Sequence, residues 1–129
     1  MKNRIVVCAS IFGLTAVILG AFGAHSLKKI VSANMLSVWQ TGIQYHFYHT
    51  FALLLLSTLN HFKPKYSKFS FYSFVMGIII FSGSLYLLAL KDFLGAPWLK
   101  YLGPITPIGG LFFILGWLGI LWGAVKGDK

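Results

Sequence analysis

In Gly42-Ile-Gln-Tyr-His-Phe-Tyr-His49, two histidines, a glutamine and two tyrosines come directly before an apolar run, Thr50 to Leu59. Polar side chains are costly inside a membrane-spanning helix unless they are paired. Residues three and four apart share a helix face, so one stripe comprises Gly42, His46, His49 and Leu53. We therefore predict that this stripe faces protein and not lipid.

The composition is typical of an integral membrane protein. Hydrophobic residues make up 57% of the 129 residues, charged residues make up 10%, and the mean hydropathy is +0.79, which is too apolar for a soluble domain. The net charge of +9 comes from basic residues that lie between apolar runs, where they anchor to lipid headgroups. We therefore expect membrane lipid as a partner and no nucleic acid. The only cysteine, Cys8, leaves no intramolecular disulfide.

Four apolar segments are long enough to cross the ~30 Å hydrocarbon layer as helices. We predict spans at about residues 5–24, 43–60, 71–90 and 103–125. The first also resembles a signal peptide, but further spans follow it and we predict that it is retained. Apolar and polar residues alternate irregularly from Leu27 to Trp39, which favours a short helix at the headgroup level with Trp39 in the aromatic belt. The prediction is an all-α fold, with residues 1–129 as one integral membrane domain: a four-helix transmembrane bundle with a short interfacial helix between spans 1 and 2.

The basic residues also predict the orientation. Four spans place seven of them on the side of the termini, namely Lys2, Arg4, Lys63, Lys65, Lys68, Lys126 and Lys129. Four lie on the other side, namely Lys28, Lys29, Lys91 and Lys100. Because Lys and Arg are enriched on the cytoplasmic side, we predict a protein of the cell (cytoplasmic) membrane with both termini in the cytoplasm.

Small residues predict where the helices approach one another closely, because backbones can meet at such positions in membrane proteins. The predicted packing positions are Gly13, Ala16, Gly20, Ala24, Gly42, Gly83, Gly119 and Gly123.

The predicted topology gathers the polar side chains of the spans in the outer half of the bundle. Measured from Gly42, His46 lies about 6 Å deep and His49 about 10 Å deep, too far to reach bulk water directly. We predict a polar network there, with each interhelical hydrogen bond contributing about 0.6 kcal/mol. Its predicted members are His25, Gln44, Tyr45, His46, His49, Ser82, Ser84, Tyr86 and Thr106.

Four motifs resemble one known family in their order along the chain. They are Gly20-Ala-Phe-Gly-Ala-His25, Tyr45-His46 with His49, Phe81-Ser-Gly-Ser-Leu-Tyr86, and Gly103-Pro-Ile-Thr-Pro-Ile-Gly-Gly110 with Gly116-Trp117. The chain resembles the domain of unknown function 423 family, small four-span membrane proteins of bacteria with eukaryotic relatives called transmembrane protein 256. The resemblance covers almost the whole chain and implies a fold and a membrane location, but no activity.

The residues support several functions. We expect a non-enzymatic scaffold or accessory protein that binds a partner membrane protein, lipid or a second copy of itself, with no cofactor. One alternative uses His25, His46 and His49 as metal ligands, since three imidazoles suit transition metals, or two of them as haem ligands. Another is a small transporter, in which histidine is the only proton carrier because the spans contain no Asp, Glu, Lys or Arg. Hydrolysis by Ser82 or Ser84 would need an orienting carboxylate, and none lies nearby in the sequence.

Overall fold

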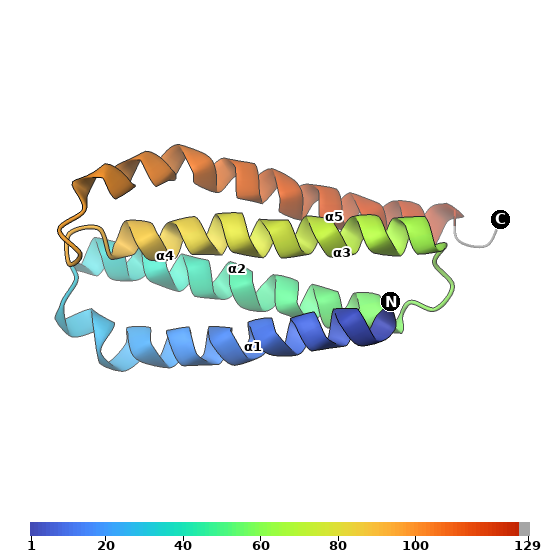
Figure 1. The fold of residues 1–129 in the computed structure, drawn as a ribbon, viewed down its shortest axis with the longest axis horizontal. Coiled ribbons are helices and arrows are strands. Elements are labelled where there is room, and N and C mark those ends of the chain that lie inside the picture. Colours follow the sequence, from blue (N-terminus) through green and yellow to red (C-terminus); the bar gives the residue numbers. More distant parts are fainter. Residues whose placement is uncertain (127–129) are drawn as a thin grey trace.

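Four long helical segments make up the structure, a computed structural model that describes residues 1–126 (Figure 1). The first two are α1, Lys2–His25, and α2, Ala33–Thr58. The third is one continuous rod built from α3, Pro64–Gly77, the π-helical turn η2, Ile78–Ser82, and α4, Gly83–Ala89. The fourth begins with the 3₁₀ helix η3, Pro97–Ile105, and continues as α5, Thr106–Lys126. Lys129, counted above in the charge comparison, lies outside the described residues.

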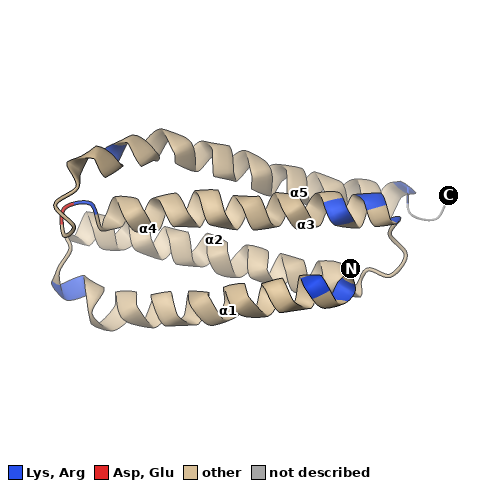
Figure 2. Cartoon of the chain, in the orientation of Figure 1, with Lys and Arg blue, Asp and Glu red and all other residues tan. Residues whose placement is uncertain are grey.

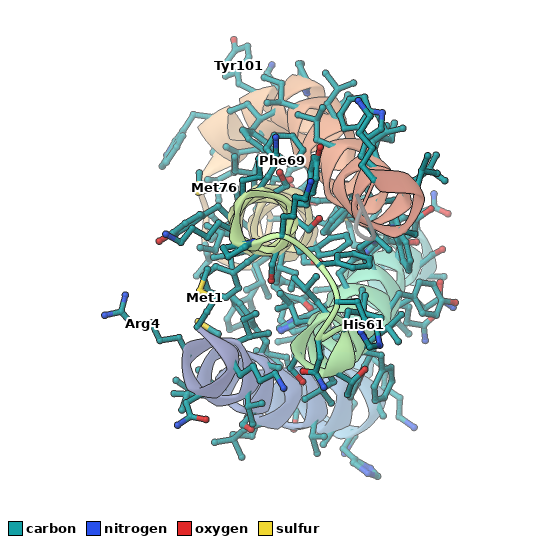
Figure 3. All side chains as sticks on the ribbon, turned by 90° about the vertical axis from the view of Figure 1, so that its right-hand side faces the viewer. Met1, Arg4, His61, Phe69, Met76 and Tyr101 are labelled. Atoms are coloured by element: carbon teal, nitrogen blue, oxygen red, sulfur yellow. The ribbon has the colours of Figure 1, made fainter. Side chains whose placement is uncertain are left out.

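The four segments form two helical hairpins packed side by side. The N-terminus, the end of α5 and the connection from α2 to α3 lie at one end, here called the termini end, while the connections after α1 and α4 lie at the other, the connection end (Figure 1). Viewed from the termini end, α1 lies beside α2, and α3 lies beside α5 (Figure 3). The predicted all-α, four-helix bundle is therefore confirmed, and every helix has a neighbour against which it can bury a face.

The charged residues lie near the two ends and leave the middle of the bundle free of charge (Figure 2). Three stretches are long and apolar enough to cross a membrane, Lys2–Lys29, Pro64–Ala89 and Pro97–Lys126. The polar cluster lies in the remaining segment, α2, whose 26 residues extend about 39 Å. α2 runs the length of the bundle beside these three stretches (Figure 1).

The segment between α1 and α2 differs from the prediction. Its short helix is a single 3₁₀ turn, η1, Leu27–Lys29, and the predicted interfacial segment already belongs to α2 from Ala33 onward. Ser32 caps α2 through a 3.2 Å hydrogen bond from the Met35 amide. Trp39 is only 2% exposed and donates its indole N–H to the Leu19 carbonyl at 3.0 Å, so the aromatic-belt prediction for Trp39 is wrong.

Aromatic rings of the third segment fit against glycines of α5, and we call this contact the ring-and-glycine seam. A β-carbon on Gly116 would lie 2.5 Å from the Phe74 ring, and one on Gly109 would lie 2.7 Å from the Phe81 Cα. Gly119 likewise faces Phe69 and Ser70, Gly123 faces Phe62, and in the opposite direction Gly77 faces Phe113. Backbone and ring are therefore in direct contact along most of the α3–α5 interface.

The other predicted packing positions divide into two groups. Ala16 is fully buried, Gly42 faces the Tyr86 ring, and β-carbons on Gly13 and Gly20 would make ordinary contacts with α2. Ala24 is exposed, and the close contact at that turn belongs to Gly23 against Trp39. Gly83 has no atom within 4 Å of an added β-carbon, so its prediction as a packing position is wrong.

Candidate functional site

The predicted stripe on α2 faces the interior of the bundle. Gly42, His46, His49 and Leu53 are all buried, with exposed fractions of 3% for His46 and 5% for His49. The stripe meets α1 on one side and the third and fourth segments on the other. The two imidazoles therefore lie where helices meet, and each must find its hydrogen-bond partners within the protein.

His46 connects α1 to α4. Its Nδ1 lies 2.8 Å from the Tyr86 hydroxyl, and its Nε2 lies 3.4 Å from Thr15 Oγ1. The Thr15 hydroxyl also lies 3.0 Å from the carbonyls of Ile11 and Phe12. Both nitrogens of His46 therefore have a hydroxyl partner within the bundle, whichever of the two carries the proton.

The tautomer of His49 is fixed by its two partners. Its Nδ1–H donates to the Tyr45 carbonyl at 2.7 Å, and its Nε2 accepts the indole N–H of Trp117 at 3.2 Å. The ring lies flat on Phe113, with 3.5 Å between centroids and 7° between planes. Both nitrogens are thus occupied, and the imidazole is fixed between α2 and α5.

Hydroxyl groups make further bonds between helices at the same level. Ser82 donates to the Gly42 carbonyl at 2.7 Å, which joins the third segment to α2. Ser84 lies 2.7 Å from Thr106 Oγ1 and 2.8 Å from the Phe81 carbonyl, which joins the third segment to α5. Among the residues described, neither serine hydroxyl is hydrogen-bonded to an imidazole, so they form no serine–histidine pair for nucleophilic catalysis.

The side chains of three predicted members form none of these hydrogen bonds. His25 is exposed at the end of α1, and Gln44 is exposed beside the Trp39 side chain, in a small pocket between α1 and α2. Neither makes a side-chain hydrogen bond within residues 1–126. Tyr45 contributes its carbonyl to His49 and its ring to a contact with Phe81, at 4.5 Å between centroids, but its hydroxyl has no protein partner in that range.

The three-histidine metal set does not form. Within residues 1–126, no three side chains of His, Cys, Asp or Glu lie close enough together to hold a metal ion. His25 is at the exposed end of α1, whereas His46 and His49 are buried and occupied by other partners. The donor set therefore does not fit a transition-metal site made from these three imidazoles.

Sequence reasoning missed two partners of the histidines. Thr15 is one of only two hydroxyl residues in the first predicted span, and a polar residue at that depth was a usable signal. Trp117 is the other missed partner, and its indole N–H donates to His49. No sequence signal identified that pairing, because it depends on how α5 is rotated about its own axis.

Comparison with known proteins gives the chain a family. Residues 19–110 match the family described as "Protein of unknown function (DUF423)". The chain belongs to that family. The "UPF0382 membrane protein" of Haemophilus influenzae is 38% identical over 98% of this chain and 97% of its own length, and "UPF0382 membrane protein YwdK" of Bacillus subtilis is 39% identical over 94% and 95%. "UPF0382 inner membrane protein YgdD" of Escherichia coli is 38% identical over 98% of this chain and 93% of its own.

Family membership and the apolar helices together identify a multi-pass membrane protein and confirm the resemblance found in the sequence. No solved structure matches the chain. The names of the relatives give a location and leave their activity unstated.

Proposed function

We propose that this protein is a non-enzymatic accessory protein of the cytoplasmic membrane, in which the His, Tyr and Ser side chains hold four helices in a fixed arrangement for a partner. One observation carries the proposal: both nitrogens of both buried histidines are occupied by partners within the bundle. A proton carrier or ligand site needs a group that is free to exchange its partner. These two imidazoles instead use both of their nitrogens in hydrogen bonds that hold the helices together.

The hydroxyl groups support the same conclusion. Ser82 donates to a backbone carbonyl of α2, and Ser84 bonds Thr106 on α5. Each links two segments, and neither is placed beside a base that would activate it. Such bonds contribute about 0.6 kcal/mol each in membrane proteins, so several together stabilise a particular packing of the helices.

The function test compares catalysis, transport and scaffolding in the same purified protein. We expect no labelling of Ser82 or Ser84 by a fluorophosphonate probe, and no proton flux above that of empty liposomes when a pH-sensitive dye is enclosed with the reconstituted protein. We also expect extraction from native membranes in mild detergent to yield a companion in fixed stoichiometry by native mass spectrometry. Labelling that Ser82→Ala removes, or proton flux that His46→Ala removes, would overturn the scaffold proposal.

The orientation is a separate part of the proposal. Support comes from the excess of basic residues at the termini end and from the name of the Escherichia coli relative, an inner membrane protein. In a Cys8→Ser background, Phe93→Cys at the connection end is expected to react with a membrane-impermeant maleimide in intact cells. The matched Lys65→Cys variant, at an exposed position of the termini end, is expected to react only after the membrane is opened. The reverse pattern of labelling would contradict the proposed orientation and place the termini end outside the cytoplasm.

A further inference from the structure

A groove of about 640 Å³ lies between α2 and α5, on the lipid-facing side of His49. Its walls include Tyr45 and Tyr48 from α2, Phe81 from η2, and Gly110, Ile114 and Trp117 from α5. Tyr48 is 55% exposed and Trp117 is 45% exposed, so the groove opens on the outer surface of the bundle, toward the membrane. Its size is within the range of small-molecule sites, which is about 300–1,000 Å³.

The lining specifies the chemistry of an occupant. No charged side chain contributes to it, so a phosphate, a carboxylate or a cation has no counter-charge there. The groove is lined by the aromatic rings of tyrosine, histidine, phenylalanine and tryptophan side chains. Aromatic rings favour stacked or edge contacts with a flat conjugated partner. The occupant is therefore neutral and mostly apolar, with a planar ring.

Two hydrogen-bond donors narrow the chemistry of the occupant further. The hydroxyls of Tyr45 and Tyr48 have no hydrogen-bond partner among residues 1–126, although both side chains line the groove. An unpaired hydroxyl is costly in an apolar medium, and a hydrocarbon chain has no acceptor for its hydrogen bond. His49 does not compete for this role, because both of its nitrogens are already bonded. The matching partner is a ring that carries carbonyl acceptors.

We propose that the groove binds a lipid-soluble quinone. Its flat ring lies among the aromatic side chains, its carbonyl oxygens accept from the two tyrosines, and its apolar tail leaves through the open side into the bilayer. This inference concerns binding alone and goes beyond the scaffold role, on which it does not depend.

The test uses the full chain in nanodiscs and a short-tailed quinone, decylubiquinone, whose binding is followed by quenching of tryptophan fluorescence. We expect saturable quenching that is lost in Trp117→Phe and kept in Trp122→Phe, since Trp122 lies outside the groove. The double variant Tyr45→Phe, Tyr48→Phe is expected to weaken binding by about tenfold or more, because two hydrogen bonds are lost. The matched control, Tyr72→Phe, removes an exposed hydroxyl on α3 and is expected to leave the affinity unchanged.

A variant that fills the groove provides an independent test of quinone binding. A β-carbon on Gly110 would meet only the Phe81 ring, at 3.9 Å, so Gly110→Leu is tolerated by the backbone and places its side chain in the groove. We expect this variant to keep the melting temperature of its circular dichroism signal and to lose saturable quenching. Equal binding by Gly110→Leu, quenching that never saturates, or equal competition by decylbenzene, which lacks carbonyls, would each overturn the quinone assignment. These outcomes leave the scaffold test untouched, because that test measures labelling, proton flux and the bound companion.

Discussion

Gly109→Ala is expected to destabilise the bundle more than any other single-methyl substitution. The added β-carbon would lie 2.7 Å from the Phe81 Cα and closer still to the Phe81 amide nitrogen. Both atoms belong to the backbone of η2, which cannot rotate away as a side chain can. One whole helix must therefore shift, and overpacking of this kind costs about 3 kcal/mol.

The measurement is the free energy of unfolding in detergent micelles, followed by circular dichroism. Gly83→Ala is the matched control, since it adds the same methyl group to the same hairpin, where no atom lies within 4 Å. We expect Gly83→Ala to change stability by about 0.5 kcal/mol or less, as surface substitutions do. Similar losses for the two variants would contradict the close contact of α5 with the π-helical turn.

His49→Ala is the second substitution with a large expected effect. It removes the acceptor of the Trp117 indole N–H and the ring that lies flat on Phe113, and it leaves a cavity at a position that is 5% exposed. A buried donor without a partner costs about 1–3 kcal/mol, and the cavity adds to that cost. We expect a total loss of about 3 kcal/mol by the same unfolding measurement.

His25→Ala is the control, because it removes an exposed imidazole that has no hydrogen bond in the described part of the chain. A metal site made from the three histidines would make these two variants similar, whereas the structure separates them. His49→Phe divides the effect further, since it keeps an aromatic ring against Phe113 and removes both hydrogen bonds of the imidazole, to Tyr45 and from Trp117. An intermediate loss is expected for it, and a loss as large as that of His49→Ala would mean that the two hydrogen bonds dominate.

The sequence predicted the features that depend on one helix at a time. Hydropathy predicted four long helices, and residue spacing placed Gly42, His46, His49 and Leu53 on one buried stripe. The predicted segments are shorter than the helices, because hydropathy detects apolar residues and the helices also include polar residues near their ends. The burial of the two histidines followed from the cost of polar groups in lipid.

The errors concern how helices face one another. The position of Trp39 in the sequence is typical of the aromatic belt, but its hydrogen-bond partner is the Leu19 carbonyl of α1. How α1 is rotated about its own axis cannot be predicted from the sequence of α2. Gly83 follows a π-helical turn, which takes more residues per turn than an α-helix and moves later residues to other faces. The α-helical period of 3.6 residues per turn therefore does not predict which face Gly83 lies on. The same limit explains why Trp117 was not paired with His49.

Spacing along the ring-and-glycine seam has a mechanical consequence. Gly109, Gly116 and Gly123 recur every seven residues, with Gly119 between the last two. A slide of α5 by one turn therefore brings only one glycine back to a position that another glycine held, and two return only after two helical turns, about 10 Å. Such a displacement would draw lysines from one end into hydrocarbon. When bilayer thickness changes, this hairpin therefore cannot shorten by sliding, and it accommodates the mismatch by tilting as one rigid unit.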